Sequence, residues 1–188
     1  MKNIDRKAEI LGAAARLFKE KGYGAVSMRD LAAALNIKAS SLYNHINSKQ
    51  EILQAIIMPL AYEFTAGMEK IKAANLTPRQ QLNHIIEQHV EISIHHPEAI
   101  ASLNNEWMNL EGDSLKQFIA MRTNYEAHLK EILQQGIAYG AFKPLDVELT
   151  IFAILSTLRT LHLWYKRKKS LRGDALKTEL KSLLQIGR

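Results

Sequence analysis

The chain has 188 residues, of which 47% are hydrophobic and 23% are charged, and it carries a formal net charge of +6. Its hydrophobic content excludes wholesale disorder, and its few glycines and prolines disfavour a sandwich or barrel of short strands. Because the chain has no cysteine, disulfides, thiolate zinc sites and a cysteine nucleophile are excluded.

The excess positive charge is concentrated near the N-terminus. Residues 1–50 contain nine lysines and arginines against four acidic residues, whereas residues 51–188 contain 16 against 15. A basic segment on a nearly neutral body favours a head that binds a polyanion. A solvated basic surface is the alternative, and charge alone does not separate the two.

No membrane segment or signal peptide is expected. The longest nearly uncharged apolar stretch, Leu149–Leu158, has about ten residues, and a membrane span needs roughly 20. The first residues show no apolar run typical of a signal peptide. The absence of cysteine is compatible with a reducing compartment. We therefore expect a soluble, cytoplasmic protein.

The first part of the chain contains two patterns typical of amphipathic helices. One apolar stripe at helical spacing consists of Ile10, Ala14, Leu17 and Phe18. Gly22 and Gly24 end this helix. Ser27 and Asp30 then form a capping-box pattern that opens a second helix. Its inward residues are Leu31, Ala32 and Leu35.

A tight turn and a short third helix follow. Asn36 tolerates a left-handed backbone better than any residue except glycine, so it suits a turn between helices. The third helix is expected over 38–45, with Leu42 and Ile46 buried. Ser48 and Glu51 form a second capping-box pattern, which opens a fourth helix. This arrangement matches helix-turn-helix geometry, although short helix pairs also occur in ordinary bundles.

The remainder predicts a helical bundle. Pro59 should kink the fourth helix, Pro78 and Pro97 should open helices, and Ser114 should cap a long one. Helices are expected over 48–74, 77–95, 96–110, 114–139, 146–165 and 174–186. The predicted fold is therefore all-α, with an N-terminal three-helix helix-turn-helix DNA-binding domain (residues 1–50) and a C-terminal helical bundle for ligand binding and dimerisation (residues 51–188).

The motifs of the N-terminal segment occupy residues 22–32, 36–37, 41–46 and 49–53. In order and spacing they resemble the TetR family of bacterial transcription regulators. The family pattern has a glycine and an aromatic, a Thr/Ser cap, an Ile/Leu-Ala pair, a turn and a Leu-Tyr-x-His/Tyr-Phe motif. Asn36 and Lys38 depart from it, because the family usually has Gly and Ser there. Residues 140–144 and 163–165 look, more loosely, like members that sense acyl-CoA-type ligands.

The resemblance implies a ligand-responsive DNA-binding regulator without catalytic activity or cofactor. It implies a homodimeric repressor on a near-palindromic operator, released by a small hydrophobic or acyl-CoA-like effector. The ligand would displace the fourth helix, which Pro59 helps to bend, and so change the spacing of the two DNA-binding heads.

The expected DNA contacts combine phosphate binding with base reading. By resemblance, Tyr43, His45 and Lys49 contact phosphates. Ser27 and Arg29 offer a helix N-terminus and a cation, both suited to phosphate. A core tyrosine and a solvated arginine are the alternatives for Tyr43 and Arg29. Base reading is expected from Lys38, Ala39, Ser40 and Ser41, with Tyr43 and Asn44 assisting.

The C-terminal bundle should supply a dimer interface and a ligand pocket. The apolar helix over 146–165 and the last helix are expected to pair with a second copy, with an intramolecular core as the alternative. The interface residues expected are Phe152, Leu155, Leu158, Leu161, Leu176, Leu180, Leu183 and Leu184. The pocket candidates, for which plain core is the alternative, are Phe64, Met68, His89, Trp107, Phe118, Met121, Arg122 and Tyr125.

Two charged features carry sharper hypotheses. A pocket arginine at Arg122 would bind an anion, unless it is exposed or pairs with Glu126 one turn later. The basic run at 166–172 is either a solvated turn or a phosphate-binding rim for a CoA-like ligand. Its residues are Lys166, Arg167, Lys168, Lys169 and Arg172. No metal-binding or nucleotide-binding motif is present.

Two other functions remain as alternatives. One is an architectural DNA-binding protein without an effector. The other is a small helical enzyme that acts on an acidic substrate, although the sequence offers no catalytic constellation. The sequence identifies neither the effector nor the operator nor the regulated genes. It also leaves open whether the regulator represses or activates transcription.

Overall fold

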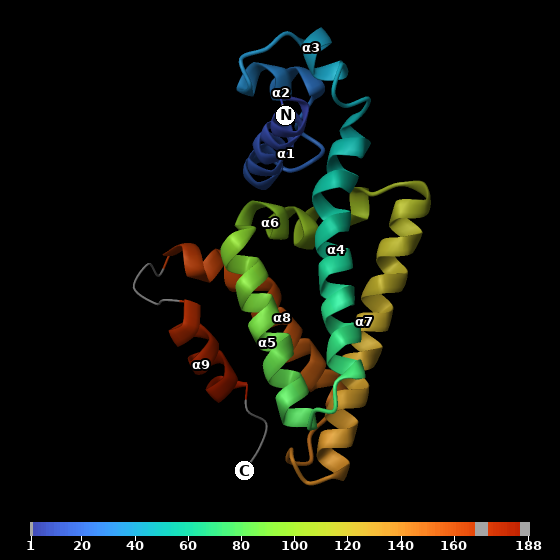
Figure 1. Cartoon of the computed structure of the whole chain (residues 1–188), viewed down its shortest axis with the longest axis vertical. Coiled ribbons are helices and arrows are strands. Elements are labelled where there is room, and N and C mark those ends of the chain that lie inside the picture. Colours follow the sequence, from blue (N-terminus) through green and yellow to red (C-terminus); the bar gives the residue numbers. More distant parts are fainter. Residues whose placement is uncertain (1, 168–172, 185–188) are drawn as a thin grey trace. The chain divides into compact units, whose positions relative to one another are not determined.

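The computed structural model describes residues 2–167 and 173–184, and all regular elements in these ranges are helical (Figure 1). This confirms the predicted all-α class. The α-helices and the single 3₁₀ turn of the described residues are α1 Lys2–Lys21, α2 Met28–Ala34, α3 Ala39–Tyr43, α4 Lys49–Ala73, α5 Pro78–His95, α6 Pro97–Glu106, η1 Trp107–Asn109, α7 Gly112–Ala138, α8 Val147–Arg167 and α9 Gly173–Leu183.

The chain forms two compact units, and neither is continuous in sequence. The first unit comprises Met1–Ala61 and Glu98–Ile119, and the second comprises Tyr62–Pro97 and Ala120–Arg188. Helices α4 and α7 each begin in the first unit and end in the second. The segment with α6 and η1 therefore belongs to the unit that holds the N-terminal helices.

In the first unit, the end of α1, the start of α2 and the turn before α3 form as the local sequence predicts. Gly22, at a φ of +80°, follows the end of α1. The capping box at α2 is complete, because Ser27 Oγ accepts from the Asp30 N–H (3.2 Å) and Asp30 Oδ2 accepts from the Ser27 N–H (2.8 Å). Asn36 has a φ of +52°, which confirms the left-handed turn between α2 and α3.

Helix α3 is held by the core beneath it. Leu42 and Ile46 are fully buried, as predicted. The helix is shorter than expected: it spans Ala39–Tyr43, and Lys38 at its N-cap makes no side-chain capping bond. At the start of α4, only half of the predicted capping box forms. Ser48 Oγ accepts from the Glu51 N–H, but the Glu51 carboxylate accepts from the Asn47 N–H instead.

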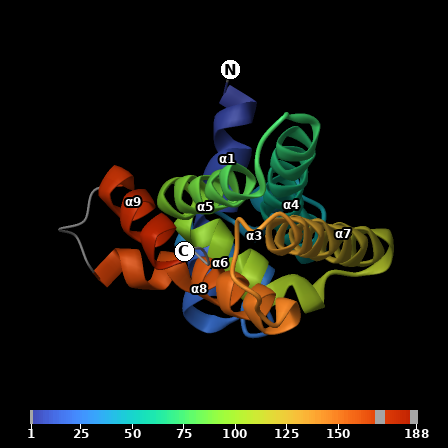
Figure 2. The same ribbon diagram turned by 90° about the horizontal axis from the view of Figure 1, so that it is seen from below.

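In the second unit, α5 packs against both α8 and α9 (Figure 2). Thr77 and Gln80 form a complete capping box at the start of α5. Apolar side chains from α4, α5, α7, α8 and α9 share one core. Its fully or almost fully buried members are Met68, Ile85, Ile86, Val90, Leu129 and Leu158.

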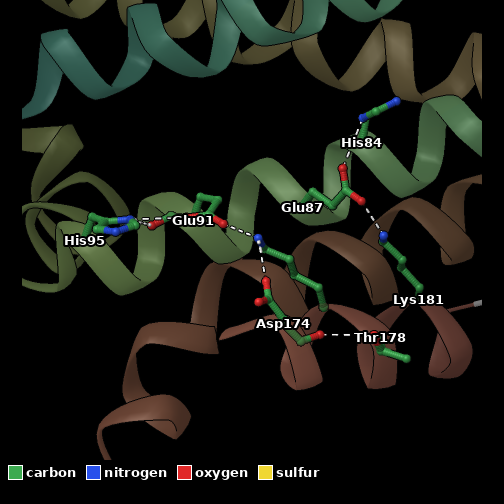
Figure 3. A network of polar contacts seen from close by, with 8 residues as sticks. His84, Glu87, Glu91, His95, Asp174, Thr178 and Lys181 are labelled. Atoms are coloured by element: carbon green, nitrogen blue, oxygen red, sulfur yellow. Dashed lines mark hydrogen bonds and ion pairs between the residues drawn. The ribbon is translucent and has the colours of Figure 1, made fainter. Parts of the chain in front are cut away.

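Ion pairs fix α9 against α5 (Figure 3). Lys177 pairs with Glu91, and Lys181 pairs with Glu87. Burial opposes ionisation of Glu87, but Lys181 and the nearby His84 outweigh it, so the pKa of Glu87 is lowered. Both lysines and both glutamates are one helical turn apart, so the two pairs hold the helices in one register.

Two predicted helix boundaries were wrong. Helix α7 begins at Gly112, two residues before Ser114, so Ser114 is not its cap. The left-handed backbone of Gly112 (φ +58°) allows the chain to turn directly into the helix. Helix α6 ends at Glu106, and the chain continues as η1 before Leu110.

Helix α8 is rich in apolar residues, although most of it is not buried within the chain. Val147–Tyr165 is long and apolar enough to cross a membrane by length and composition, but core helices of soluble proteins pass the same test. Only 28% of this stretch is buried within the chain. Much of its apolar surface is therefore available to a partner.

The turn between α7 and α8 depends on a close approach. The N–H groups of Ala141 and Phe142 both donate to the Gly136 carbonyl, at 2.8 and 3.0 Å, and the Phe142 ring is buried. A Cβ atom at Gly136 would lie 2.0 Å from Cδ2 of that ring. Gly136 is therefore the residue that makes room for Phe142.

We predict that Gly136→Ala destabilises the protein. Alanine is favoured over glycine inside a helix by about 1 kcal/mol, but expelling a buried phenylalanine ring costs about 3–5 kcal/mol. The expected net loss is about 2 kcal/mol or more in urea unfolding. Gly24→Ala is the control, because a Cβ atom there meets nothing within 4 Å. Equal stabilities of the two variants would contradict the prediction.

Candidate functional site

The outer face of α3 presents hydrogen-bond donors to solvent. Leu42 points into the core, whereas Tyr43 on the same helix is 51% exposed. The other predicted base-reading positions are at least partly accessible. Lys38, Ser40 and Asn44 are exposed, and Ala39 and Ser41 are half-buried. A helix with one buried side and a polar outer side can enter a DNA major groove.

The residues predicted to contact phosphate differ in their availability. Arg29 is exposed at the start of α2, and His45 is half-buried after α3. Ser27 is exposed, but its hydroxyl and N–H both bond the Asp30 carboxylate. These hydrogen bonds from Ser27 lower the pKa of Asp30, so a negative charge stands beside Ser27 at neutral pH. This charge makes the start of α2 less attractive to a phosphate.

Lys49 has a structural role in the unit that holds it. Its ammonium group donates to the carbonyls of Tyr23 and Val26, each at 2.9 Å. It also lies 4.1 Å from the centroid of the Tyr23 ring. These contacts tie the start of α4 to the turn before α2. The phosphate contact of Lys49 stays a prediction, and it would have to use the remaining donor of the ammonium group.

Gln50 joins the helix-turn-helix segment to η1, a role that the sequence did not reveal. Its Nε2 atom donates to the Tyr23 hydroxyl (3.0 Å) and to the Asn109 carbonyl (2.5 Å). Lys19 on α1 adds an ion pair to Glu98 on α6 at 3.4 Å. A glutamine near a helix start gives no sequence signal for such a contact, because Asn109 is 59 positions away.

The predicted pocket residues fall into two groups. Phe64, His89 and Tyr125 meet in the second unit: the Phe64 and His89 rings are 4.6 Å apart, and His89 Nε2 is 3.0 Å from the Tyr125 hydroxyl. Met68 is buried in the same core, and Met121 is half-buried. Trp107 and Phe118 form the second group and stack on each other in the first unit, with their ring centroids 5.6 Å apart.

The interior pair His89 and Tyr125 is neutral at physiological pH. Burial, assisted by the positive charge of Arg159, lowers the pKa of His89 to about 3. Burial also raises the pKa of Tyr125 well above its usual value. The hydrogen bond between them satisfies two polar groups in an apolar surrounding.

Arg122 forms the ion pair with Glu126 that was the alternative to an anion site. Its Nε atom is 3.4 Å from Glu126 Oε1, and Arg159 of α8 contacts the same oxygen at 2.7 Å. Arg159 was not among the residues that the sequence singled out. The sequence feature that could have identified it is its position as a charged residue in the middle of the otherwise apolar helix α8.

The predicted dimer interface needs a correction. Five of its residues lie in the chain's own core with at most 6% exposure: Leu155, Leu158, Leu161, Leu176 and Leu180. Leu184 is partly buried against that core. Phe152 (68%) and Leu183 (76%) are exposed. The other exposed apolar residues of α8 are Leu149, Leu163 and Trp164.

Two predictions concern charged or metal-binding features of the chain. Of the basic run at 166–172, Lys168, Lys169 and Arg172 lie outside the described residues, and the side chains of Lys166 and Arg167 are not described either. The phosphate-rim hypothesis therefore stays a prediction. Among the residues that the structure describes, no group of three or more His, Cys, Asp or Glu side chains could hold a metal ion.

A short, core-anchored helix with a polar outer face, set in a three-helix segment, defines a helix-turn-helix transcriptional regulator. Family comparisons agree. Residues 10–56 match the family model described as bacterial regulatory proteins, tetR family, and residues 75–184 match the tetracyclin repressor-like C-terminal domain. The chain belongs to the TetR family. It is a ligand-responsive regulator that binds operator DNA, dimerises and binds a small-molecule effector.

Individual relatives support the family assignment. The transcriptional repressor KstR2 of Rhodococcus jostii is 26% identical over 97% of this chain and 90% of the relative. The structure of the ketosteroid transcriptional regulator KstR2 of Mycobacterium tuberculosis covers 96% of this chain and 93% of its own, with 25% identity and a TM-score of 0.87. The regulator PfmR of Thermus thermophilus is 31% identical over 95% and 97% of the two chains, with a TM-score of 0.78. These relatives are transcriptional regulators, not enzymes.

The buried His89 predicts a pH dependence of stability. In the unfolded chain a histidine takes up a proton near its ordinary pKa of about 6.5, whereas in the fold His89 stays neutral until about pH 3. The unfolded state therefore binds more protons between these values, and stability falls as pH drops below about 6.5. Between about pH 7 and pH 5, His89 should remove about 2 kcal/mol of unfolding free energy.

Urea unfolding of the wild type and His89→Gln at both pH values measures this effect. Glutamine keeps a hydrogen-bonding group for Tyr125 but does not titrate. Contributions from other groups cancel in the difference between the two proteins. An unchanged pH dependence in His89→Gln would show that His89 is not the group responsible.

Proposed function

We propose that α3 reads the operator and that the polar residues on its outer face are the base-reading set. The observation that carries this proposal is the opposite placement of Leu42, which is fully buried, and Tyr43, which is half-exposed. The set is Lys38, Ala39, Ser40, Ser41, Tyr43 and Asn44. In this proposal Arg29 and His45 bind phosphates beside the helix, while Ser27 and Lys49 chiefly hold the segment in shape.

The proposed regulator acts as a repressor in the cytoplasm, where the chromosome lies. Its relatives KstR2 of R. jostii and M. tuberculosis are named transcriptional repressors. A single head makes few base contacts, so two copies should bind half-sites about one helical turn apart, or a multiple of it. The DNA-binding domain in this proposal is residues 1–50, and residues 51–188 bind the effector and the second copy.

The proposed dimer interface is the exposed apolar surface of α8. Large apolar side chains on a soluble surface indicate a protein partner, and a symmetric dimer places the same surface of two copies together. Leu183 on α9 extends this apolar area. The α8 residues of the surface are Leu149, Phe152, Leu163 and Trp164.

The first prediction tests α3. Lys38→Ala removes an exposed donor from the reading face and should weaken binding to a selected operator by about tenfold per half-site. Lys116→Ala is the matched control, because its side chain is 80% exposed on α7, away from α3. Fluorescence anisotropy with a duplex selected from a random library, at one fixed salt concentration, measures both affinities. Equal losses of operator affinity in the two variants would show that Lys38 contributes only a non-specific positive charge.

A second prediction tests the dimer. Phe152→Glu places two charges in a two-fold interface, so the variant should sediment as a folded monomer and bind operator more weakly. Met108→Glu is the matched control: Met108 is also 68% exposed, but it lies in η1 of the first unit. Analytical ultracentrifugation distinguishes the outcomes. A Phe152→Glu dimer as stable as the control would exclude this surface of α8 as the interface.

A further inference from the structure

The amide of Gln50 joins two segments of the first unit, η1 and the turn at residues 22–26 between α1 and α2. Its Nε2 atom donates to the hydroxyl of Tyr23 in this turn (3.0 Å) and to the carbonyl of Asn109 at the end of η1 (2.5 Å). A carbonyl oxygen can only accept, so the amide nitrogen, and not the amide oxygen, must face Asn109. Both N–H donors of one side chain are thus used, one for the turn and one for η1.

This orientation has a cost on the other side of the amide. Gln50 Oε1 is buried and receives no hydrogen bond from the residues that the structure describes. Burying an acceptor without a donor offsets part of the stabilisation that the two hydrogen bonds provide. The turn itself is already held by Lys49, which binds the carbonyls of Tyr23 and Val26. What the amide adds is the link from the turn to η1.

The end of α6 approaches the same turn at a second point. A Cβ atom at Gly22 would lie 3.9 Å from Glu106 Oε1. The other carboxylate oxygen of Glu106 accepts from the side chain of Asn109 at 2.9 Å, so these two residues hold each other beside the turn. The 22–26 turn therefore borders this segment at Gly22, and the Gln50 amide connects the segment to Tyr23.

We propose that Gln50 is a positioning residue for operator binding. Its bridge from η1 to Tyr23 holds the 22–26 turn, from which α2 and the proposed reading helix α3 follow, in the conformation that binds DNA. Without the bridge the turn moves more freely and must be ordered when the operator binds, which lowers affinity. The inference rests on the proposed function, because it assigns a residue outside α3 a part in the operator affinity of α3.

Fluorescence anisotropy of the full-length protein with a selected operator duplex, at one fixed salt concentration, tests the proposal. Gln50→Met removes both donors and the unpartnered oxygen at similar side-chain length. It should weaken operator binding about fivefold, the loss of about one ordinary hydrogen bond. Tyr23→Phe removes the other end of the bridge and should have a similar effect. The two losses should not add in the double variant, because each substitution breaks the same bridge.

Gln88→Met is the matched control. Gln88 also donates through Nε2 to a backbone carbonyl of another helix, that of Glu63 at 2.8 Å. Its Oε1 atom is likewise buried without a partner among the described residues, but Gln88 lies in the second unit. A substitution there removes the same chemical groups and should leave operator affinity unchanged.

Hydrogen exchange followed by mass spectrometry supplies a readout that needs no DNA. The N–H groups of Gly22 and Val26 are hydrogen-bonded to backbone carbonyls, so they report on the turn. Peptides that contain the turn should exchange about fivefold faster in Gln50→Met than in wild type or Gln88→Met. Peptides from α5 should exchange at the wild-type rate, which separates a loosened turn from a general loss of stability.

Three outcomes overturn the proposal: wild-type operator affinity in Gln50→Met, an equal loss of affinity in Gln88→Met, or a loss of affinity in Gln50→Met without faster exchange in the turn. Failure of the proposed function looks different, because the wild type itself would then bind no selected duplex more tightly than random DNA.

Discussion

Burial of Leu42 and Ile46 is the constraint on which the proposed DNA-reading surface of α3 depends. Helix α3 has only five residues, far fewer than an isolated helix needs to be stable in water. Its N-cap, Lys38, supplies no side-chain capping bond. Packing of these two apolar residues must therefore stabilise the helix, and the same packing turns its polar side outward. Stability and recognition at α3 have one physical origin.

The frame around α3 is fixed from both ends. Asn36 supplies the left-handed turn before it, and the ammonium group of Lys49 binds two carbonyls near Tyr23 after it. The neighbouring Gln50 then continues from Tyr23 to η1. Two adjacent residues at the start of α4 thus serve internal contacts. From the sequence alone, a lysine and a glutamine beside the proposed DNA-reading helix would be taken for DNA ligands.

The sequence predicted several features that depend on neighbouring residues, although the Ser48–Glu51 capping box forms only in part and Ser114 is not the cap of α7. It missed contacts and burial that distant residues decide. The capping box at Ser27 and the left-handed turn at Asn36 follow from local chemistry, and the structure contains both. Helix α8 is apolar on more than one side, so hydrophobicity alone could not separate Leu158 in the chain's own core from the exposed Phe152. The pairing of Arg159 with Glu126 joins residues 33 positions apart, which no periodicity reveals.

Helix α7 begins in the first unit and ends in the second. Arg122 and Phe118 are one turn apart on this helix, and Phe118 stacks on Trp107 of η1. The last residue of η1, Asn109, accepts the hydrogen bond of Gln50. Within the first unit, the start of α7 is thus tied through η1 to the amide of Gln50, and through that amide to Tyr23.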